Sequence, residues 1–488
     1  MSSKENSKNL WEVWEKDLRR DSLTPLYMRL ADCFENAINQ GVWLPFSQLP
    51  SIREISKRLA VSKNTVSAAY DFLAVRGVIF KEAKKRAVVQ LPIKKTPDWY
   101  SLAQPHVQML SPIAKHHQRQ NVCLDNKAIN LSHRMVETWD NYEGTRFLKP
   151  FMNKVFVKIS SGAYKNIYDE QGFIGLREEL THYLKSTYNI VCSPKEILIC
   201  SRRMQIYNLL SEVFLSPNIF AGLEKINFLN FYRVGISRVA QRIFLPINQN
   251  GLNIEPLKAI HNSRFLFIQP SHSEPSGTVT DMKARREILN YCGMNRIPIV
   301  EDGVMDPLYE NEGRNLQPMK SIDTYGNVIY IGGVHGPLSP GLSLDWVVAP
   351  IPVIQLLLAA VRREAQFPSE LNQLILYEVL QKQALNEYFL QESNLMTIKR
   401  KTFEDVVQHY LGDVAEWSED QCFGRLWITF KDPISVSVLY NKGKSVDFFP
   451  GSFYGDESDR SILLYLFEET EIFEEGIQRL RALIDSLF

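Results

Sequence analysis

The stretch LPSIREISKRLAVSKNTVSAAYDFLAVRG, residues 49–77, decides the fold of the amino-terminal part of the chain. Its apolar positions recur at three- and four-residue steps, which predicts two short helices separated by a tight turn. The first helix should cover about 51–59. The second should begin after Ser62, which is a good N-cap residue, and end before Gly77. The stretch therefore predicts a helix-turn-helix.

The residues on either side extend this unit to a winged helix. Apolar periodicity predicts a helix over 24–41, and 78–89 reads as two short strands around a basic turn. Within 51–90 the chain has nine Lys or Arg and three Asp or Glu, a local charge of +6, whereas its net charge is only +1. A basic run is often just a solvated surface, but this one coincides with helix-turn-helix spacing. The coincidence predicts binding to nucleic acid.

A recognition helix must present short polar and basic side chains at its N-terminal end to the major groove, while its other face packs on the domain. We therefore expect contacts with double-stranded DNA from the starts of both helices and from the basic turn of the wing. The predicted DNA-binding residues are Ser51, Arg53, Ser62, Lys63, Asn64, Thr65, Lys84, Lys85 and Arg86.

The same stretch resembles the winged helix of the GntR family of transcriptional regulators. Residues 49–53 are similar to the family's Leu-Pro-Ser-x-Arg, and residues 61–66 to its Val-Ser-Arg-Asn-Thr-Val. The wing departs from the family pattern, because residues 84–87 read Lys-Lys-Arg-Ala where a glycine is usual. The resemblance implies a sequence-specific, DNA-binding transcriptional regulator.

Beyond the winged helix the sequence predicts a linker and a large α/β domain. Four prolines and no sustained period mark a linker over 91–126. The predicted organisation is an N-terminal extension (1–23), the winged helix (24–90), the linker (91–126) and the large domain (127–488). In that domain, helical stretches such as Leu176–Tyr188 and Met204–Phe214 alternate with strand candidates, which favours a mostly parallel sheet. The candidates are Ile197–Cys200, Lys225–Asn230, Phe265–Ile268, Pro298–Glu301, Val328–Ile331 and Trp346–Ala349.

The large domain resembles the aminotransferase-like domain of MocR-type regulators, a GntR subfamily. The resemblance rests on Tyr168–Glu178, Gln269–Gly277, Val300–Asp302 and Val328–Leu342, in the family's order. It implies a fold-type-I domain with a mostly parallel sheet and a smaller C-terminal α+β subdomain. It also implies a homodimer, which would pair two winged helices for two half-sites.

The family cofactor is pyridoxal phosphate, which needs a lysine amine, an acid at the ring nitrogen, a ring hydroxyl partner and phosphate donors. In this chain the lysine position is Gly336, the tyrosine position is Val304, and the phosphate-binding arginine position is Ser343. Asp302 remains at the acid position, although an acid at a strand end is also a common loop cap. We therefore expect no bound cofactor and no aminotransferase activity.

The degenerate site can still form a pocket for a small-molecule effector. Its predicted residues are Ser201, Arg202, Ser271, His272, Asp302, His335, Gly336 and Ser343. Arg202 stands where a glycine usually lets backbone amides approach the phosphate, and both histidines also fit ordinary structural roles. A substrate-carboxylate arginine is expected at Ile462, with Arg460 two residues away.

The cysteine spacing and the distribution of apolar residues exclude several classes of protein. The six cysteines have no metal-ligand or disulfide spacing, the amino terminus has no apolar signal core, and no run approaches the roughly 20 apolar residues of a membrane span. No other catalytic motif replaces the lost lysine. These features predict a cytoplasmic protein without a metal site or a membrane partner.

Three hypotheses remain open from the sequence. The first is a regulator whose inactive aminotransferase-like domain dimerises and senses an effector noncovalently. The second is a regulator or enzyme that retains pyridoxal phosphate through Asp302. The third is a regulator whose large domain is a dimerisation scaffold without any ligand.

Overall fold

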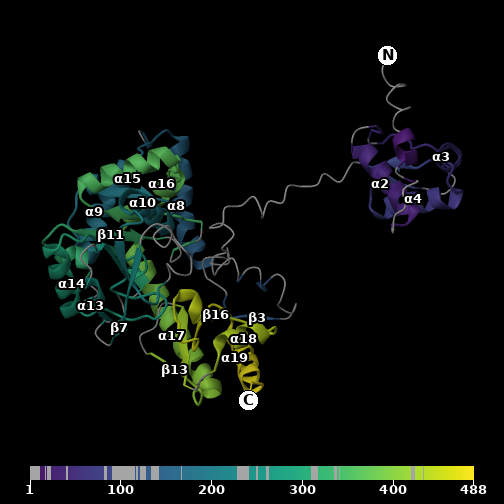
Figure 1. Cartoon of the computed structure of the whole chain (residues 1–488). Helices are drawn as coiled ribbons and strands as arrows, with labels where there is room; N and C mark the ends of the chain where they lie inside the picture. The colour runs from purple at the N-terminus through teal and green to yellow at the C-terminus, as the bar shows by residue number, and fades with distance from the viewer. Residues whose placement is uncertain are drawn as a thin grey trace. The chain divides into compact units, whose positions relative to one another are not determined.

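The computed structural model describes most of the chain in two compact units, residues 1–109 and 110–488 (Figure 1). The described residues are 11–16, 18, 24–39, 42–44, 46–81, 85–90, 116, 119–120, 128–132, 142–165, 167–227, 241–248, 251–259, 263–308, 317–334, 338–339, 341–418, 424–431 and 434–487.

The amino-terminal unit is the predicted winged helix. Its elements are α2 (Leu26–Asn39), α3 (Ile52–Leu59), α4 (Lys63–Val75), β1 (Ile79–Phe80) and β2 (Val88–Val89). The strands pair antiparallel, with Ile79 opposite Val89. The order of three helices and a hairpin agrees with the sequence prediction.

Local hydrogen bonds define the turn between α3 and α4. Ser51 and Glu54 form a capping box at the start of α3, and Ala60 ends that helix in the left-handed conformation with φ of 54°. Ser62 caps α4 by accepting the backbone N–H of Thr65 at 3.0 Å. These caps satisfy amides that a helix start leaves without partners, and so fix where the recognition helix begins.

An aromatic cluster joins the segment before residue 24 to the winged helix. Trp11 and Trp14 are buried in the core that the three helices share. The Trp14 ring lies 4.8 Å from that of Phe34 and 6.2 Å from that of Trp43, measured between ring centroids. The predicted extension therefore supplies part of the hydrophobic core of the DNA-binding unit.

A seven-stranded sheet lies at the centre of the large unit. Its order is β4-β12-β11-β10-β9-β5-β6, and among these strands β12 alone runs antiparallel to its neighbours. The strands are β4 (Ile197–Cys200), β5 (Phe220–Glu224), β6 (Gln241–Leu245), β9 (Ser263–Ile268), β10 (Ile299–Asp302), β11 (Val328–Gly333) and β12 (Asp345–Val348). The sheet is thus mostly parallel, as predicted.

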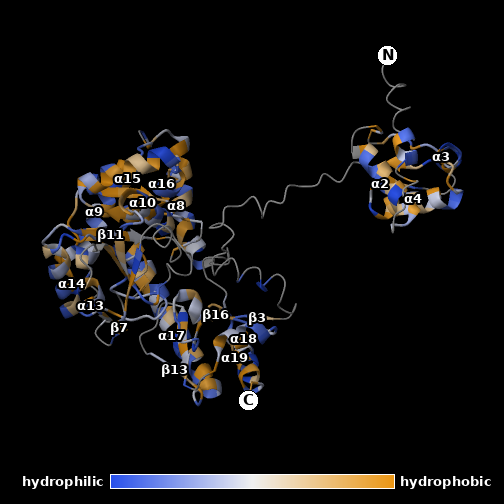
Figure 2. Cartoon of the chain, in the orientation of Figure 1, coloured by the Kyte–Doolittle hydropathy of each residue, from blue (hydrophilic) through white to orange (hydrophobic). Residues whose placement is uncertain are grey.

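Helices cover both faces of this sheet (Figure 1). α10 (Arg203–Phe214) and α15 (Ile351–Glu364) pack on one face. On the other face lie α9 (Ile174–Tyr188), α16 (Glu370–Gln381), α13 (Glu255–Lys258) and α14 (Met282–Met294). Successive residues of a strand point to opposite faces, and with both faces covered the central strand β11 is apolar and buried along its length (Figure 2). The result is a three-layer α/β domain.

One strand prediction was wrong. Lys225–Asn230 was expected to be a strand, but the strand is β5, which ends at Glu224, and residues 228–230 lie outside the described residues. The pattern of residues 220–224 did not indicate a strand, because it contains Gly222 and glycine is rare in strands. In the structure a Cβ at Gly222 would lie 3.0 Å from the Leu257 side chain, so close packing explains the glycine.

The C-terminal part of the chain forms a smaller α+β subdomain, as expected. Its sheet has the order β13-β14-β17-β16, with all neighbours antiparallel. The elements are α17 (Leu385–Leu411), β13 (Ala415–Trp417), β14 (Arg425–Phe430), α18 (Val436–Lys442), β15 (Val446–Asp447), β16 (Phe449–Pro450), β17 (Ser461–Tyr465) and α19 (Thr470–Asp485). Also in the large unit are β3 (Ile129–Asn130), which pairs with β15, α8 (Tyr142–Ser160), β7 (Ile247–Asn248) and β8 (Gly251–Leu252).

Part of the predicted linker belongs to the core of the large unit. His116 is buried, and its Nδ1 lies 2.8 Å from the hydroxyl of Tyr440. Arg119 forms a buried ion pair with Asp447. Because His116 and Arg119 are held in this way and the large compact unit spans 110–488, that unit begins within 91–126, before the predicted boundary.

Candidate functional site

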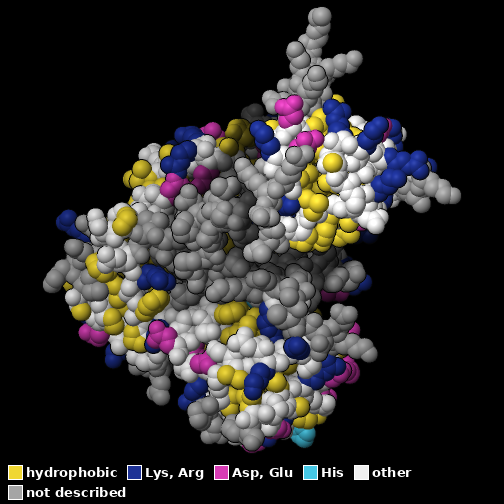
Figure 3. All heavy atoms as spheres, turned by 45° about the vertical axis from the view of Figure 1, so that its right-hand side comes forward, with side chains coloured by type: hydrophobic (Ala, Val, Ile, Leu, Met, Phe, Trp, Pro, Cys, Tyr) yellow, Lys and Arg dark blue, Asp and Glu magenta, His cyan; other side chains and the backbone are white. Residues whose placement is uncertain are grey.

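The start of α4 presents the predicted recognition residues at the surface. Lys63 and Asn64 are exposed at the first helical positions, and Arg53 is exposed near the start of α3. Their side chains make no ion pair with the residues that the structure describes. Lys and Arg side chains gather on one side of the amino-terminal unit (Figure 3). This arrangement fits a helix that meets the major groove with its N-terminal end.

Three of the predicted contact residues have structural roles in the helix caps. The hydroxyls of Ser51 and Ser62 accept backbone N–H groups at their helix starts, at 3.3 and 3.0 Å. The hydroxyl of Thr65 lies 2.8 Å from that of Ser62. A capping hydroxyl keeps a further lone pair or proton for a phosphate, so the cap does not exclude contact with DNA.

The wing is tied to α3 by a surface ion pair. Arg86 lies 3.2 Å from Glu54, and both side chains are about half exposed. Lys85 is exposed beside it, whereas Lys84 lies outside the described residues. The pair leaves Arg86 less available to a phosphate than the sequence suggested, because its charge is partly neutralised within the protein.

The second candidate site lies at the carboxyl ends of the parallel strands in the large unit. Asp302 is the last residue of β10, and its carboxylate is fully buried. One oxygen accepts the hydroxyl of Tyr207 at 2.9 Å, and the other accepts the backbone N–H of Val304 at 3.1 Å. Gln269, which follows β9, extends its amide toward the same carboxylate at 3.5 Å. Crevices at such strand ends are the usual ligand sites of α/β sheets.

Asp302 belongs to a cluster of four charged side chains. The guanidinium of Arg203 lies 2.8 Å from Glu274 and 3.4 Å from Asp302. Glu274 also pairs with Arg425, which comes from β14 of the C-terminal subdomain. Both acids are buried, and both arginine side chains are only 15% exposed. Two positive and two negative charges therefore form a closed cluster inside the protein.

The pKa values of the two acids reflect this environment. Burial raises the pKa of Glu274, but Arg203 and Arg425 overcome that effect and hold it well below the usual range. Burial raises the pKa of Asp302, and Arg203 offsets the rise in part. Both acids lie against the same guanidinium, so we treat Glu274 as ionised and Asp302 as the acid with the higher pKa.

The N-terminus of α10 is occupied by a carboxylate of the chain itself. The backbone N–H of Arg203 donates to Asp345 at 2.5 Å. Asp345 is buried in β12 opposite Gly333 of β11, and a Cβ at Gly333 would lie 1.9 Å from its carboxylate. Glycine at 333 therefore makes room for this acid. A carboxylate at a helix N-terminus takes the place that an external anion would need.

Arg202 approaches Ser343, the residue at the expected position of a phosphate-binding arginine. The Nε of Arg202 donates to the hydroxyl of Ser343 at 2.9 Å, and Arg202 is exposed. Beside it, the backbone N–H of Ser201 donates to the side chain of Gln205 at 2.9 Å. The backbone N–H of Ser201 and the hydroxyl of Ser343 are thus both engaged within the protein.

These observations do not fit pyridoxal phosphate. Its ring nitrogen would compete with Arg203 for Asp302, and its phosphate would meet the carboxylate of Asp345. Val304 is buried and has no hydroxyl to offer. Gly336 and His335 lie outside the described residues, so the lysine position rests on sequence alone.

The other predicted pocket residues do not form a second catalytic group. Ser271 and His272 are buried after β9. Ile462 is buried in β17, and the guanidinium of Arg460 donates to backbone carbonyls, including that of Phe430. Arg460 therefore does not take the place of the substrate-binding arginine.

Sequence reasoning missed the residues that fill the site. Glu274 lies inside the stretch Gln269–Gly277, and Arg203 directly follows Arg202, but of these residues only Arg202 was weighed. A base and an acid in two stretches that the fold brings to one site could have signalled an ion pair. Asp345, Tyr207 and Arg425 carried no such signal, because only the fold brings them to Asp302.

The described residues contain no helix that is long and apolar enough to cross a membrane. Nor do they contain a group of three or more His, Cys, Asp or Glu side chains that could hold a metal ion.

Comparisons with known proteins agree with the folds described for the amino-terminal unit and for the large unit. Residues 26–89 match the model of the gntR family of bacterial regulatory proteins. The uncharacterized HTH-type transcriptional regulator YdfD of Bacillus subtilis is 28% identical, and the match covers 95% of this chain and 97% of that protein. The probable rhizopine catabolism regulatory protein MocR of Rhizobium meliloti is 22% identical, with 95% of each chain covered.

The large unit resembles solved aminotransferases in its fold. Kynurenine aminotransferase of Pyrococcus horikoshii superposes with a TM-score of 0.70 at 19% identity, covering 80% of this chain and 99% of that one. The prediction of a GntR helix-turn-helix domain joined to an aminotransferase-like α/β fold is therefore confirmed.

Proposed function

We propose that this chain is a sequence-specific DNA-binding transcriptional regulator whose aminotransferase-like domain works without pyridoxal phosphate. The GntR domain and the named relatives support the regulatory role. The observation that carries the second part is the pairing of Arg203 with Asp302 and Glu274. A basic side chain of the protein itself supplies the positive partner that Asp302 would otherwise find in the ring nitrogen of the cofactor.

In this proposal the large domain is not an enzyme. Schiff-base chemistry needs a lysine amine, and the sequence has Gly336 at that position. Asp345 at the start of α10 further opposes a phosphate group, because two negative charges would compete for the same backbone N–H. The domain acts instead as a dimerisation domain, so that two winged helices read two half-sites.

Two measurements on the full-length protein test DNA recognition and dimerisation separately. Selection from random duplexes, followed by fluorescence anisotropy, should yield a site bound at least 1,000-fold more tightly than scrambled duplex, as expected for specific regulators. Equal affinity for both duplexes would remove the regulatory assignment. Size-exclusion chromatography with light scattering should give the mass of two chains, and a single-chain mass would contradict the dimer.

The cofactor part is tested by incubation with pyridoxal phosphate and borohydride, followed by peptide mass spectrometry. We expect only low, scattered labelling of surface lysines and no visible absorbance band of bound cofactor. A cofactor-dependent aminotransferase treated in parallel shows that the procedure works. Stoichiometric labelling of one lysine would overturn the proposal and favour a regulator or enzyme that retains the cofactor through Asp302.

A further inference from the structure

A cavity of about 760 Å³ lies at the end of the large sheet opposite to Asp302. Pro298 directly precedes β10 and Asn327 directly precedes β11, and both line this cavity. It therefore opens at the amino ends of the parallel strands, whereas Asp302 ends β10. The cavity is distinct from the former cofactor site and shares no lining residue with the charged cluster.

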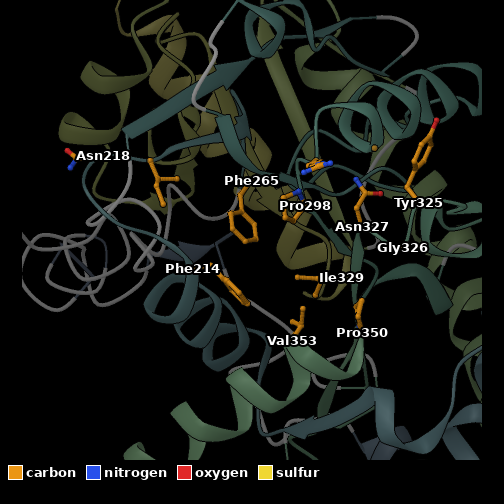
Figure 4. Close-up of a pocket in the computed structure, with 13 residues that line it drawn as sticks. Phe214, Asn218, Phe265, Pro298, Tyr325, Gly326, Asn327, Ile329, Pro350 and Val353 are labelled. Atoms are coloured by element: carbon orange, nitrogen blue, oxygen red, sulfur yellow. The ribbon is translucent and has the colours of Figure 1, made fainter.

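The inside of the cavity is apolar. Phe214 of α10, Phe265 of β9, Ile329 of β11 and Val353 of α15 turn their side chains toward a common space (Figure 4). Its volume is within the range of roughly 300–1,000 Å³ that is usual for small-molecule sites. Two aromatic rings and two branched side chains favour a ligand with a flat or branched apolar body.

The polar groups lie around this apolar centre. Arg296 is the only charged side chain among the lining residues that the structure describes, and it forms no ion pair within that part of the chain. It is exposed and lies just beyond the end of α14. Its backbone is left-handed, with φ of 56°. The side-chain oxygen of Asn327 is buried without a hydrogen-bond partner among the described residues, while its nitrogen donates to Ile297 at 2.8 Å. The cavity thus offers one cation at its rim.

We propose that this cavity binds a small organic acid with an apolar, ring-containing body, whose acidic group pairs with Arg296. Burial of the body against the phenylalanine rings supplies apolar stabilisation. An ion pair at the rim keeps the acid near water, where desolvation costs little. The proposal stands independently of the DNA-binding function.

The test uses 1-anilinonaphthalene-8-sulfonate, which combines aromatic rings, an N–H and an anionic group, with the full-length protein. We expect saturable binding of one probe per chain, followed by its fluorescence. Val353→Trp, which fills the cavity, should weaken binding at least tenfold. Leu356→Trp is the matched control, because Leu356 lies on the same helix, is 50% exposed and does not line the cavity.

A second variant removes the charge without altering the fold. Asparagine tolerates the left-handed backbone at 296, so Arg296→Asn should fold normally and weaken probe binding about tenfold, which corresponds to roughly 1.4 kcal/mol. Arg286→Gln, on the exposed face of α14, should leave binding unchanged. Probe binding that is absent in the native chain, or unaffected by both cavity variants, would overturn the proposal.

Competition between two ligands of similar shape, of which only one carries an acidic group, tests whether the cavity prefers an acid. 4-Phenylbutyrate should displace the probe at a concentration at least tenfold lower than 4-phenylbutanol, and the two should become equal in Arg296→Asn. Equal displacement from the native chain would show that the cavity takes a neutral ligand, which contradicts the proposed class.

Discussion

The guanidinium of Arg203 lies 3.4 Å from the carboxylate of Asp302 and thereby closes the site where a cofactor ring would need that acid. The same guanidinium is 2.8 Å from Glu274, so two buried acids share one base at the start of α10. A buried charge that loses its partner is far more costly than a surface charge. This arrangement makes Arg203 a structural residue of the large domain.

We predict that Arg203→Ala lowers the free energy of unfolding of the large domain by about 3–5 kcal/mol, because two buried acids lose their shared partner. Chemical denaturation measures the change. Arg202→Ala is the matched control: this neighbour is exposed and its side chain bonds only to Ser343 among the described residues, so its loss should cost less than about 1 kcal/mol. Adding Asp302→Asn to Arg203→Ala should restore most of the lost stability, because Glu274 keeps Arg425 as its partner. Equal effects of the two arginine variants would contradict the assigned role of Arg203.

Glu224 gives the large domain a pH-dependent stability. Burial raises the pKa of Glu224 from 4.5 to about 7, although Ser273 and the backbone N–H of Gln269 donate to it and lower the pKa in part. Between pH 4.5 and 7 the folded chain holds a proton that the unfolded chain has lost, so stability falls as pH rises through this window. The total loss is at most about 3.5 kcal/mol, since a tenfold change in proton affinity is worth about 1.4 kcal/mol.

The variant Glu224→Gln should remove this contribution to the pH dependence. Urea unfolding at pH 5, 6, 7 and 8 should show the native chain losing stability relative to the variant as pH rises. Glu457→Gln, whose side chain is 81% exposed, is the control and should follow the native chain. A constant difference between native chain and Glu224→Gln across this range would show that Glu224 is ionised throughout.

The parts of the fold that the sequence predicts are those with local signals. Ser62, the helical periodicity of α4 and the apolar run of β10 each specify an element from neighbouring residues. Asp302 was found because a motif surrounds it. The contact of Arg203 with Glu274 joins residues 71 positions apart, and Arg425 comes from another subdomain. Such contacts depend on tertiary packing, which no local pattern encodes.

The amino-terminal segment offers a third prediction. Trp14 is 4% exposed and packs on Phe34 and Trp43, so Trp14→Ala should destabilise the winged helix by roughly 3–5 kcal/mol, the usual cost of truncating a buried aromatic. Hydrogen exchange of the α2 amides in the full chain measures this change. Val13→Ala is the control, since Val13 is 50% exposed on the same turn. Unchanged exchange in Trp14→Ala would mean that the segment does not contribute to the core.

Removing single positive charges at the helix starts should weaken operator binding. Lys63 and Arg53 are exposed and make no ion pair with the described residues, so each alanine variant should lose a phosphate contact and lower the salt dependence of binding by about one ion. Lys81→Ala is the control, because Lys81 already pairs with Asp71 at 2.7 Å and should contribute little to DNA. Anisotropy titrations with the selected operator at several salt concentrations measure both quantities. If Lys63→Ala and Arg53→Ala kept the affinity and salt dependence of the native chain, the start of α4 would not face the DNA and another surface of the winged helix would have to be sought.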